Sequence, residues 1–241
     1  MALIGEDYPK IELELFGLEL LEPMALAIDT VIAMVSFVIA YKLGKRAVDH
    51  PYFTYWKSFF YVFGLAALVG GFGHLFYNYW GLAGKIPTWI LAPISVYVLE
   101  QGMISVYPNP KKIPLLKRIS FWKYIVVVGV WLAVLLMADL SVNEKKPFLP
   151  IIINSGLSLV MVGIVMTTYY AKKIDPNYKY ITYGTIMSFP ALFVTLFKIN
   201  LHPWFNREDF GHVMIVITLI YYYIGLKKIS RNFSEQHNPV S

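Results

Sequence analysis

Seven runs of mostly apolar residues dominate this sequence, and each is long enough to cross a lipid bilayer as a helix. A helix needs about 20 apolar residues to span the hydrocarbon core. None of the runs shows the strict alternation of a transmembrane barrel strand. The predicted spans are Met24–Tyr41, Trp56–Tyr77, Ile86–Val106, Phe121–Leu140, Phe148–Tyr170, Tyr180–Phe197 and Gly211–Leu226. The sequence therefore predicts an all-α polytopic membrane protein with seven transmembrane helices.

Charged residues are too scarce to cover a water-soluble surface. They make up 15% of the 241 residues, and 57% of the residues are hydrophobic. A soluble domain usually carries about 25% charged and about 45–50% apolar residues. This excludes a soluble enzyme and a disordered chain, and the absence of cysteine excludes a disulfide scaffold. We interpret the net charge of +6 as a consequence of membrane topology rather than of nucleic-acid binding.

The distribution of basic residues predicts the orientation in the membrane. Fifteen of the 21 lysines and arginines fall in segments on one side of the predicted spans, and cytoplasmic loops carry such an excess. The N-terminus is therefore expected outside and the C-terminus in the cytoplasm. Residues 1–22 form an acidic extracytoplasmic leader, 23–229 the seven-helix domain and 230–241 a disordered cytoplasmic tail. The alternating run at 11–15 fits a short strand, but a solvated leader is the favoured interpretation.

Three ionisable residues fall at a similar depth in different spans. Asp29 lies six residues past Pro23, about 9 Å along its helix. His74 lies near the outer end of the second span and His212 at the start of the seventh. In a sequentially wound bundle the last helix closes against the first, so we expect the three side chains to converge near the extracytoplasmic face. Ionisable groups inside spans usually face the bundle interior.

Two chemical interpretations of this group remain open. Two imidazoles and a carboxylate suit zinc or another first-row metal, with a position left for water. Asp209 lies one helical turn before His212 and is placed to orient its imidazole, and Glu208 or Asp209 is the candidate for proton transfer. The alternative is structural, because a buried carboxylate that pairs with a histidine is satisfied without metal or catalysis.

Other polar and small residues in the spans are expected to serve packing. Glu100 lies about 21 Å below the start of its helix, where it is expected with Gln101 to hydrogen-bond to another helix; no partner at its depth supports a functional role. Asp139 lies near the outer end of the fourth span and reaches water by extending along the helix. Two pairs of small residues four positions apart, between Ala66 and Gly71, are typical of closely packed membrane helices.

Three short segments carry a resemblance that covers nearly the whole chain. The sequence resembles an uncharacterised bacterial family of seven-helix membrane proteins, which implies location in the bacterial inner membrane. The segments are Leu21-Glu22-Pro23 with Asp29-Thr30, Gly70-Gly71-Phe72-Gly73-His74, and Trp204-Phe205-Asn206-Arg207-Glu208-Asp209-Phe210-Gly211-His212.

A more distant similarity rests on a histidine late in the second helix and another early in the seventh. In this respect the chain is similar to the alkaline ceramidase and adiponectin-receptor superfamily of zinc-dependent membrane hydrolases. The similarity implies that His74 and His212 stand for two metal ligands. Gly70 stands where that superfamily has a serine, and Val216 where it has a second histidine of the last helix.

The working hypothesis is a metal-dependent hydrolase that acts on a lipid amide or ester. Asp29, His74 and His212 would hold the metal, with zinc as the candidate, and Glu208 or Asp209 would transfer protons. The expected partners are the lipid bilayer and a lipid-like substrate, with no nucleic acid. The alternative is a non-catalytic membrane protein, either a partner subunit or a ligand sensor, in which the same residues hold helices together.

Overall fold

The computed structural model describes residues 3–46, 48–137 and 146–237. Within these residues, six helical segments are long and apolar enough to cross a membrane. This confirms an all-α, multi-pass membrane architecture for the described residues. The six segments are Pro23–Gly44, Pro51–Leu75, Tyr77–Ser105, Pro110–Met137, Leu149–Lys173 and Arg207–Glu235.

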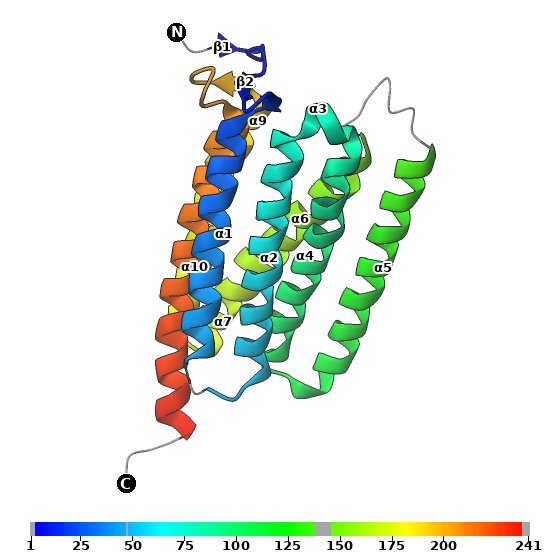
Figure 1. The fold of residues 1–241 in the computed structure, drawn as a ribbon. Coiled ribbons are helices and arrows are strands. Elements are labelled where there is room, and N and C mark those ends of the chain that lie inside the picture. The colour runs from blue at the N-terminus through cyan, green and yellow to red at the C-terminus, as the bar shows by residue number, and fades with distance from the viewer. Residues whose placement is uncertain (1–2, 47, 138–145, 238–241) are drawn as a thin grey trace.

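The helices run side by side along one direction, and short strands cover one end of the bundle (Figure 1). We call the end that carries the strands the strand end, and the opposite end, where the last helix finishes, the C-terminal end. The helices are α1 (Pro23–Gly44), α2 (Pro51–Leu75), α3 (Tyr77–Trp80), α4 (Ile86–Ser105), α5 (Ile113–Met137), α6 (Leu149–Val160), α7 (Thr167–Lys173), α8 (Lys179–Met187), α9 (Phe189–Leu196) and α10 (Arg207–His237). A π-helical segment, Met161–Met166, joins α6 to α7.

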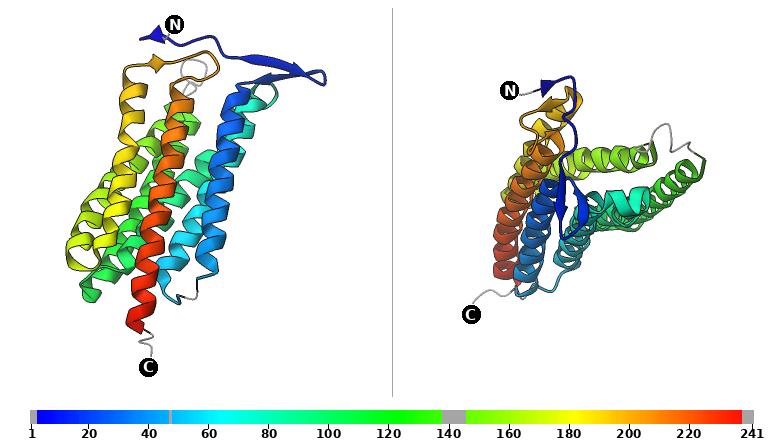
Figure 2. Two further views of the ribbon diagram at one scale, coloured as in Figure 1. Left: turned by 90° about the vertical axis from the view of Figure 1, so that its left-hand side faces the viewer. Right: turned by 45° about the horizontal axis from the view of Figure 1, so that its top comes forward.

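The predicted span Tyr180–Phe197 is not one helix. It consists of α8 and α9, which follow one another along the bundle and meet at Ser188 (Figure 2, left). Pro190 lies in the first turn of α9, where its missing N–H is tolerated. Each piece alone is shorter than a bilayer-spanning helix.

The acidic leader forms strands instead of remaining solvated coil. Its first strand, β1 (Leu3–Ile4), pairs antiparallel with β4 (Ile199–Asn200), which precedes the last helix. Strands β2 (Glu12–Leu15) and β3 (Leu18–Leu21) form a hairpin. Most of the alternating run at 11–15 therefore forms a strand, β2. Between the two strand pairs the leader crosses the strand end of the bundle (Figure 2, left).

Helices α1 and α2 pack closely because glycines of α2 face α1. A Cβ added to Gly71 would lie 3.0 Å from the Cα atom of Leu26 and 3.0 Å from the Cβ atom of Asp29. A Cβ added to Gly64 would lie 2.9 Å from Ser36 Cβ. Gly71 belongs to one of the predicted small-residue pairs, so close approach of the helices is confirmed there.

The best-packed part of the bundle lies toward the C-terminal end. Aromatic residues of α2, α7 and α10 meet there with Tyr178, and their side chains are fully or almost fully buried. Helix α5 belongs to the least buried of the six long segments, and Ser120 and Trp131 are its only described buried residues. It lies at the edge of the bundle (Figure 1).

The last helix is longer than expected. Helix α10 continues to His237, although the sequence analysis predicts a disordered tail from residue 230. Ser230 is buried and accepts a hydrogen bond from Arg46, which ties the end of α10 to the segment after α1. Asp139 and Leu140, the predicted end of the fourth span, lie outside the described residues.

Candidate functional site

Asp29 and His212 meet at the strand end, as the depth argument predicts. Helix α1 packs between α2 and α10, which places Asp29 beside the first turns of α10. The Nδ1 atom of His212 lies 3.4 Å from the Oδ1 atom of Asp29. His74 lies within electrostatic range of the same carboxylate. The two histidines therefore flank Asp29, but only His212 is in ion-pair contact with it.

The Asp29 carboxylate is buried and poorly satisfied. Only 5% of the residue is exposed. Among the described residues no donor makes a hydrogen bond to its oxygens, and the buried Nδ1 atom of His212 has no hydrogen-bond partner either. A buried carboxylate without donors is costly, since it has lost water and gained little in return. This pair is the least satisfied polar contact at the strand end.

His74 pairs with Glu22, which sequence reasoning assigned to the leader. The Nδ1 atom of His74 lies 3.0 Å from Glu22 Oε2, and Lys10 Nζ lies 3.3 Å from the same oxygen. Burial raises the pKa of the Glu22 carboxyl, but the hydrogen bond from His74 and the charge of Lys10 outweigh it and lower the pKa to about 2. The signal in the sequence was the position of Glu22 directly before Pro23, at the depth of His74.

The proposed proton-transfer residues lie at the start of α10, where Asp209 has a capping role. Its Oδ2 atom accepts a 2.9 Å hydrogen bond from the backbone N–H of Asn206. In return, Asn206 Oδ1 accepts hydrogen bonds from the backbone N–H groups of Glu208 and Asp209. This reciprocal arrangement satisfies the free donors of the first helical turn. Asp209 is 3% exposed and lies within electrostatic range of His212.

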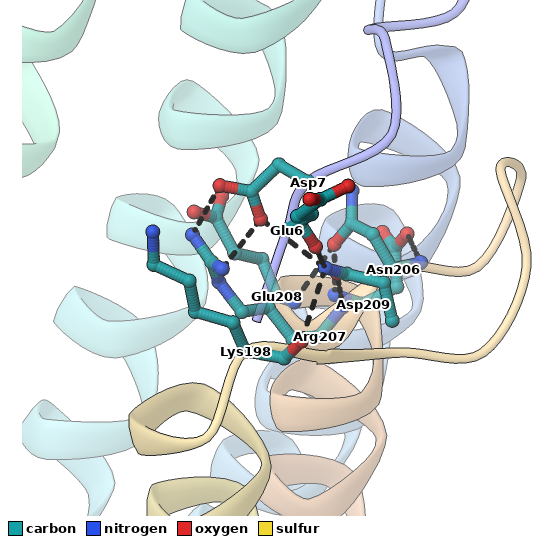
Figure 3. Close-up of polar contacts among 8 residues, drawn as sticks. Glu6, Asp7, Lys198, Asn206, Arg207, Glu208 and Asp209 are labelled. Atoms are coloured by element: carbon teal, nitrogen blue, oxygen red, sulfur yellow. Dashed lines mark hydrogen bonds and ion pairs between the residues drawn. The ribbon is translucent and has the colours of Figure 1, made fainter. Parts of the chain in front are cut away.

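A polar cluster holds the leader to the start of α10 (Figure 3). The buried Asn200 side chain donates hydrogen bonds to Glu6 O at 2.7 Å and to Asp7 Oδ1 at 3.2 Å. Its own oxygen accepts from the backbone N–H of Arg207 at 3.0 Å. The Arg207 guanidinium forms an ion pair with Asp7. We call residues 7–11, which run from this cluster to the hairpin, the strap.

A cavity of about 1220 Å³ lies beneath the strap. At the strand end its wall includes Glu22, Asp29, His74, Asp209 and His212. Farther in, the wall becomes apolar. Phe63 of α2 belongs to this apolar part of the wall. It is 11 residues from His74, which corresponds to about 16 Å along the helix. A large pocket with a few polar groups at one end is the usual form of a binding site for an amphipathic molecule.

The cavity also reaches the side of the bundle. Its wall includes Leu149, Ile152 and Leu157 of α6 and Leu192 of α9, and each of these residues is more than half exposed. Helix α6 packs against α4 and α5, whereas α9 packs against α10 and α8. The cavity therefore lies between two groups of helices, on an apolar side of the bundle.

A second group of ionisable residues lies nearer the C-terminal end. Glu100 of α4 forms an ion pair with Lys123 of α5, and it accepts hydrogen bonds from Ser120 at 2.6 Å and from Ser158 at 2.5 Å. Lys123 also donates to Asn154 at 2.8 Å and to Ser158 at 2.7 Å. The expected hydrogen bonds of Glu100 to another helix are confirmed, but its charged partner is not foreseen, because Lys123 extends from the start of its span into the bundle. We call these five residues the Glu100 cluster.

No group of three or more His, Asp or Glu side chains within residues 3–46, 48–137 and 146–237 is arranged to hold a metal ion. Asp29, His74 and His212 are close, yet they do not form a ligand set as they stand. Both imidazoles direct Nδ1 toward a carboxylate, His74 to Glu22 and His212 to Asp29. Metal-bound histidines often make this contact and use Nε2 as the ligand atom.

A family model described as a family of unknown function, DUF6962, matches residues 24–231. The match begins next to the start of α1 and ends within α10, so it covers every helix of the bundle. No curated protein matches the chain, and no solved structure does.

Proposed function

Since the chain belongs to the family of unknown function DUF6962, we propose its function from the site alone: it binds a lipid-like amphiphile within the membrane. The observation that carries this proposal is the cavity beneath the strap. Its volume of about 1220 Å³ is sufficient for a long-chain ligand, and its wall is polar at the strand end and apolar farther in. A headgroup at Asp29 and His212 with an alkyl chain along Phe63 matches that gradient.

The ligand enters from the bilayer through the side of the bundle. Exposed apolar residues of α6 and α9 form that part of the cavity wall, where lipid chains would contact them. The strap covers the end of the cavity that faces water, held by the Arg207–Asp7 ion pair and by the contact between Lys10 and Glu22. Lateral entry suits a molecule that is already dissolved in the membrane.

Binding of an uncharged long-chain alcohol tests this function. Tritiated dodecanol would be bound to protein in digitonin, a detergent without a linear alkyl chain, and measured by scintillation proximity. The Gly156→Phe variant places a ring in the cavity wall on α6 at a position where an added Cβ meets nothing within 4 Å. We expect saturable binding that Gly156→Phe weakens by about tenfold, the loss of roughly 1.4 kcal/mol of contact.

Gly129→Phe is the matched control. Gly129 also has open space around an added Cβ, but it lies on α5 away from the cavity wall. Dodecanol binding should be the same in this variant as in the wild type. Non-saturable uptake, or equal loss in both variants, would contradict a binding cavity.

The bundle crosses the membrane with seven spans, the sixth of them formed by α8 and α9 together. Residues 179–196 rise about 27 Å as helix, close to the thickness of the hydrocarbon core. The lysine and arginine excess places the strand end outside and the C-terminal end in the cytoplasm. The resemblance to bacterial seven-helix proteins supports location in the bacterial inner membrane.

Single cysteines test the orientation, because the chain has none of its own. Phe16→Cys lies at the exposed turn of the strand-end hairpin, and Asp49→Cys lies in the exposed loop after α1. An impermeant maleimide should label the first in intact cells and the second only after permeabilisation. The reverse labelling pattern would overturn the orientation.

The second candidate is a zinc-dependent hydrolase of a lipid amide or ester. The observation that favours it is the contact of both imidazoles with carboxylates through Nδ1. Asp29, His74 and His212 would hold the metal after a closer approach, and Glu208 or Asp209 would move protons. Without metal, the same cavity serves a ligand sensor or a partner subunit.

Metal content separates these alternatives. Protein purified without chelators would be analysed by mass spectrometry, together with His74→Ala, His212→Ala and the surface control His202→Ala. Stoichiometric zinc that both site variants lose and the control retains supports the hydrolase. A wild type that stays empty after zinc is added back rules it out.

A further inference from the structure

Building on the amphiphile-binding cavity proposed above, we propose that its ligand carries a positively charged amine headgroup and that Asp29 binds it. The proposal names the class of ligand, a long-chain amine whose nitrogen carries hydrogen atoms. Three features support this assignment: the environment of Asp29, the charges around it and the two acceptor oxygens beside Gly70.

The Asp29 carboxylate lacks donors in the part of the chain that the structure describes. It forms part of the cavity wall, is 95% buried and has His212 at 3.4 Å as its ion-pair partner, with no hydrogen bond between them. Carboxylates buried in proteins normally accept hydrogen bonds from several donors. A ligand with N–H donors in the cavity would satisfy these oxygens.

The basic side chains of the cavity wall are held at its rim. Lys10 contacts Glu22, Arg207 contacts Asp7, and the Lys85 ammonium lies 4.7 Å from the centre of the Tyr77 ring. Farther in, two buried carboxylates, Asp29 and Asp209, lie within electrostatic range of one another.

His212 is the one imidazole in ion-pair contact with Asp29 among the described residues. Even with His212 charged, the two buried carboxylates leave one negative charge, and the other imidazole within electrostatic range of Asp29, that of His74, is bound to Glu22. Burial of an uncompensated charge is strongly unfavourable, so a cationic ligand is favoured over a neutral or anionic one.

Gly70 has no side chain to cover the oxygen atoms of Thr88 and Asp29, and all three residues line the cavity. A Cβ added to Gly70 would lie 3.2 Å from Thr88 Oγ1 and 3.8 Å from Asp29 Oδ2. The Thr88 hydroxyl already donates its proton to the Ala66 carbonyl at 2.6 Å, so its lone pairs are left as acceptors. Two acceptor oxygens close together on the cavity wall fit an ammonium, which has three donors and no acceptor. A quaternary ammonium lacks these donors and is bulkier.

Competition with tritiated dodecanol tests the proposal on the full-length protein at pH 7. Unlabelled dodecylamine, dodecanol and dodecyltrimethylammonium share one chain and differ in the headgroup. We expect dodecylamine to bind at least about tenfold more tightly than dodecanol, as a charge-assisted hydrogen bond allows. Asp29→Asn should remove that preference, and saturable dodecanol binding that persists in the variant shows that it is folded.

Two further variants complete the design. Gly70→Ala, which adds a methyl group beside Thr88 Oγ1 and Asp29 Oδ2, should weaken dodecylamine binding more than dodecanol binding. Asp49→Asn, a carboxylate of the exposed loop after α1, is the control and should preserve the preference. Equal binding of all three ligands, tighter binding of the quaternary compound, or a preference that survives Asp29→Asn would overturn the amine headgroup and leave the cavity intact. If no ligand binds saturably, the proposed function itself fails.

Discussion

The bundle contains two buried groups of ionisable residues, and they differ in how well their members satisfy one another. In the Glu100 cluster every charged group has a partner, because α5 supplies an ammonium and a hydroxyl and α6 supplies a second hydroxyl to the Glu100 carboxylate, while the ammonium also donates to the Asn154 amide oxygen of α6. At the strand end, Asp29 and His212 face each other without a hydrogen bond and border a cavity. Saturated polar networks hold structures together, whereas unsatisfied ones are typical of sites that await a ligand.

The comparison also separates two uses of a carboxylate in a membrane helix. Glu100 joins α4 to α5, a helix that buries few other residues. Asp29 makes no described hydrogen bond to another helix, although it lies at the closely packed contact of α1 with α2. Mutations should therefore affect mainly stability in the first group and mainly ligand binding in the second.

The largest expected effect is the loss of stability in Lys123→Met. It leaves Glu100 buried without its cation, and removal of one partner of a buried ion pair costs about 3 kcal/mol or more. Thermal unfolding in detergent should show a clear fall in the midpoint. The double variant Glu100→Gln/Lys123→Met should recover much of the loss, and Lys117→Met serves as the control for removal of a lysine from α5. An unchanged midpoint in Lys123→Met would show that the Glu100 cluster contributes little to stability.

Glu22 should give a smaller effect that depends on pH. Its pKa of about 2 lies below the ordinary value of 4.5 for a glutamate carboxyl, so the native state favours the charged form. The contribution to stability is fully present above pH 4.5 and is lost as the pH falls from about 4.5 to about 2. Wild type should exceed Glu22→Gln by about 1–3 kcal/mol at pH 6, and the gap should close in acid. A gap of the same size at pH 6 and pH 3 would contradict the contact of Glu22 with His74 and Lys10.

Asp29→Asn should change stability little, in contrast to Lys123→Met. The substitution removes a buried charge that no described donor satisfies, so the unfolding midpoint should stay within about 1 kcal/mol of wild type or rise. Thermal unfolding without added ligand measures it. A loss as large as that of Lys123→Met would place Asp29 among the structural residues and remove the distinction between the two groups.

The smallest effect is expected when the strap is locked. Ile4 and Ile199 face each other in the β1–β4 pair, at a separation that suits a disulfide between substituted cysteines. If the ligand enters between α6 and α9, oxidation of Ile4→Cys/Ile199→Cys should leave the rate of dodecanol binding unchanged. A large drop in rate that reduction reverses would instead place the entry route under the strap.

Much of the site was accessible from residue depth alone. The rise of 1.5 Å per residue and the helix order were enough to bring Asp29 next to His212. Residue depth does not predict the pairing of His74 with Glu22, because Glu22 precedes the first span and belongs to the leader, which is expected to be solvated. The partner of Glu100 was missed for a similar reason. A lysine near a span end is normally read as a loop charge, yet its long side chain reaches inward and places the ammonium beside Glu100.

The amino-acid sequence is sufficient to predict a helical, multi-pass membrane protein, because the free energy of inserting a span depends on the composition of a local run of about 20 residues. The fold is needed to show that the leader forms strands across one end, that the predicted sixth span breaks at Ser188, and that a cavity separates α6 from α9. These features depend on contacts between residues far apart in the chain. The pairing of Leu3 with Asn200 is one such contact.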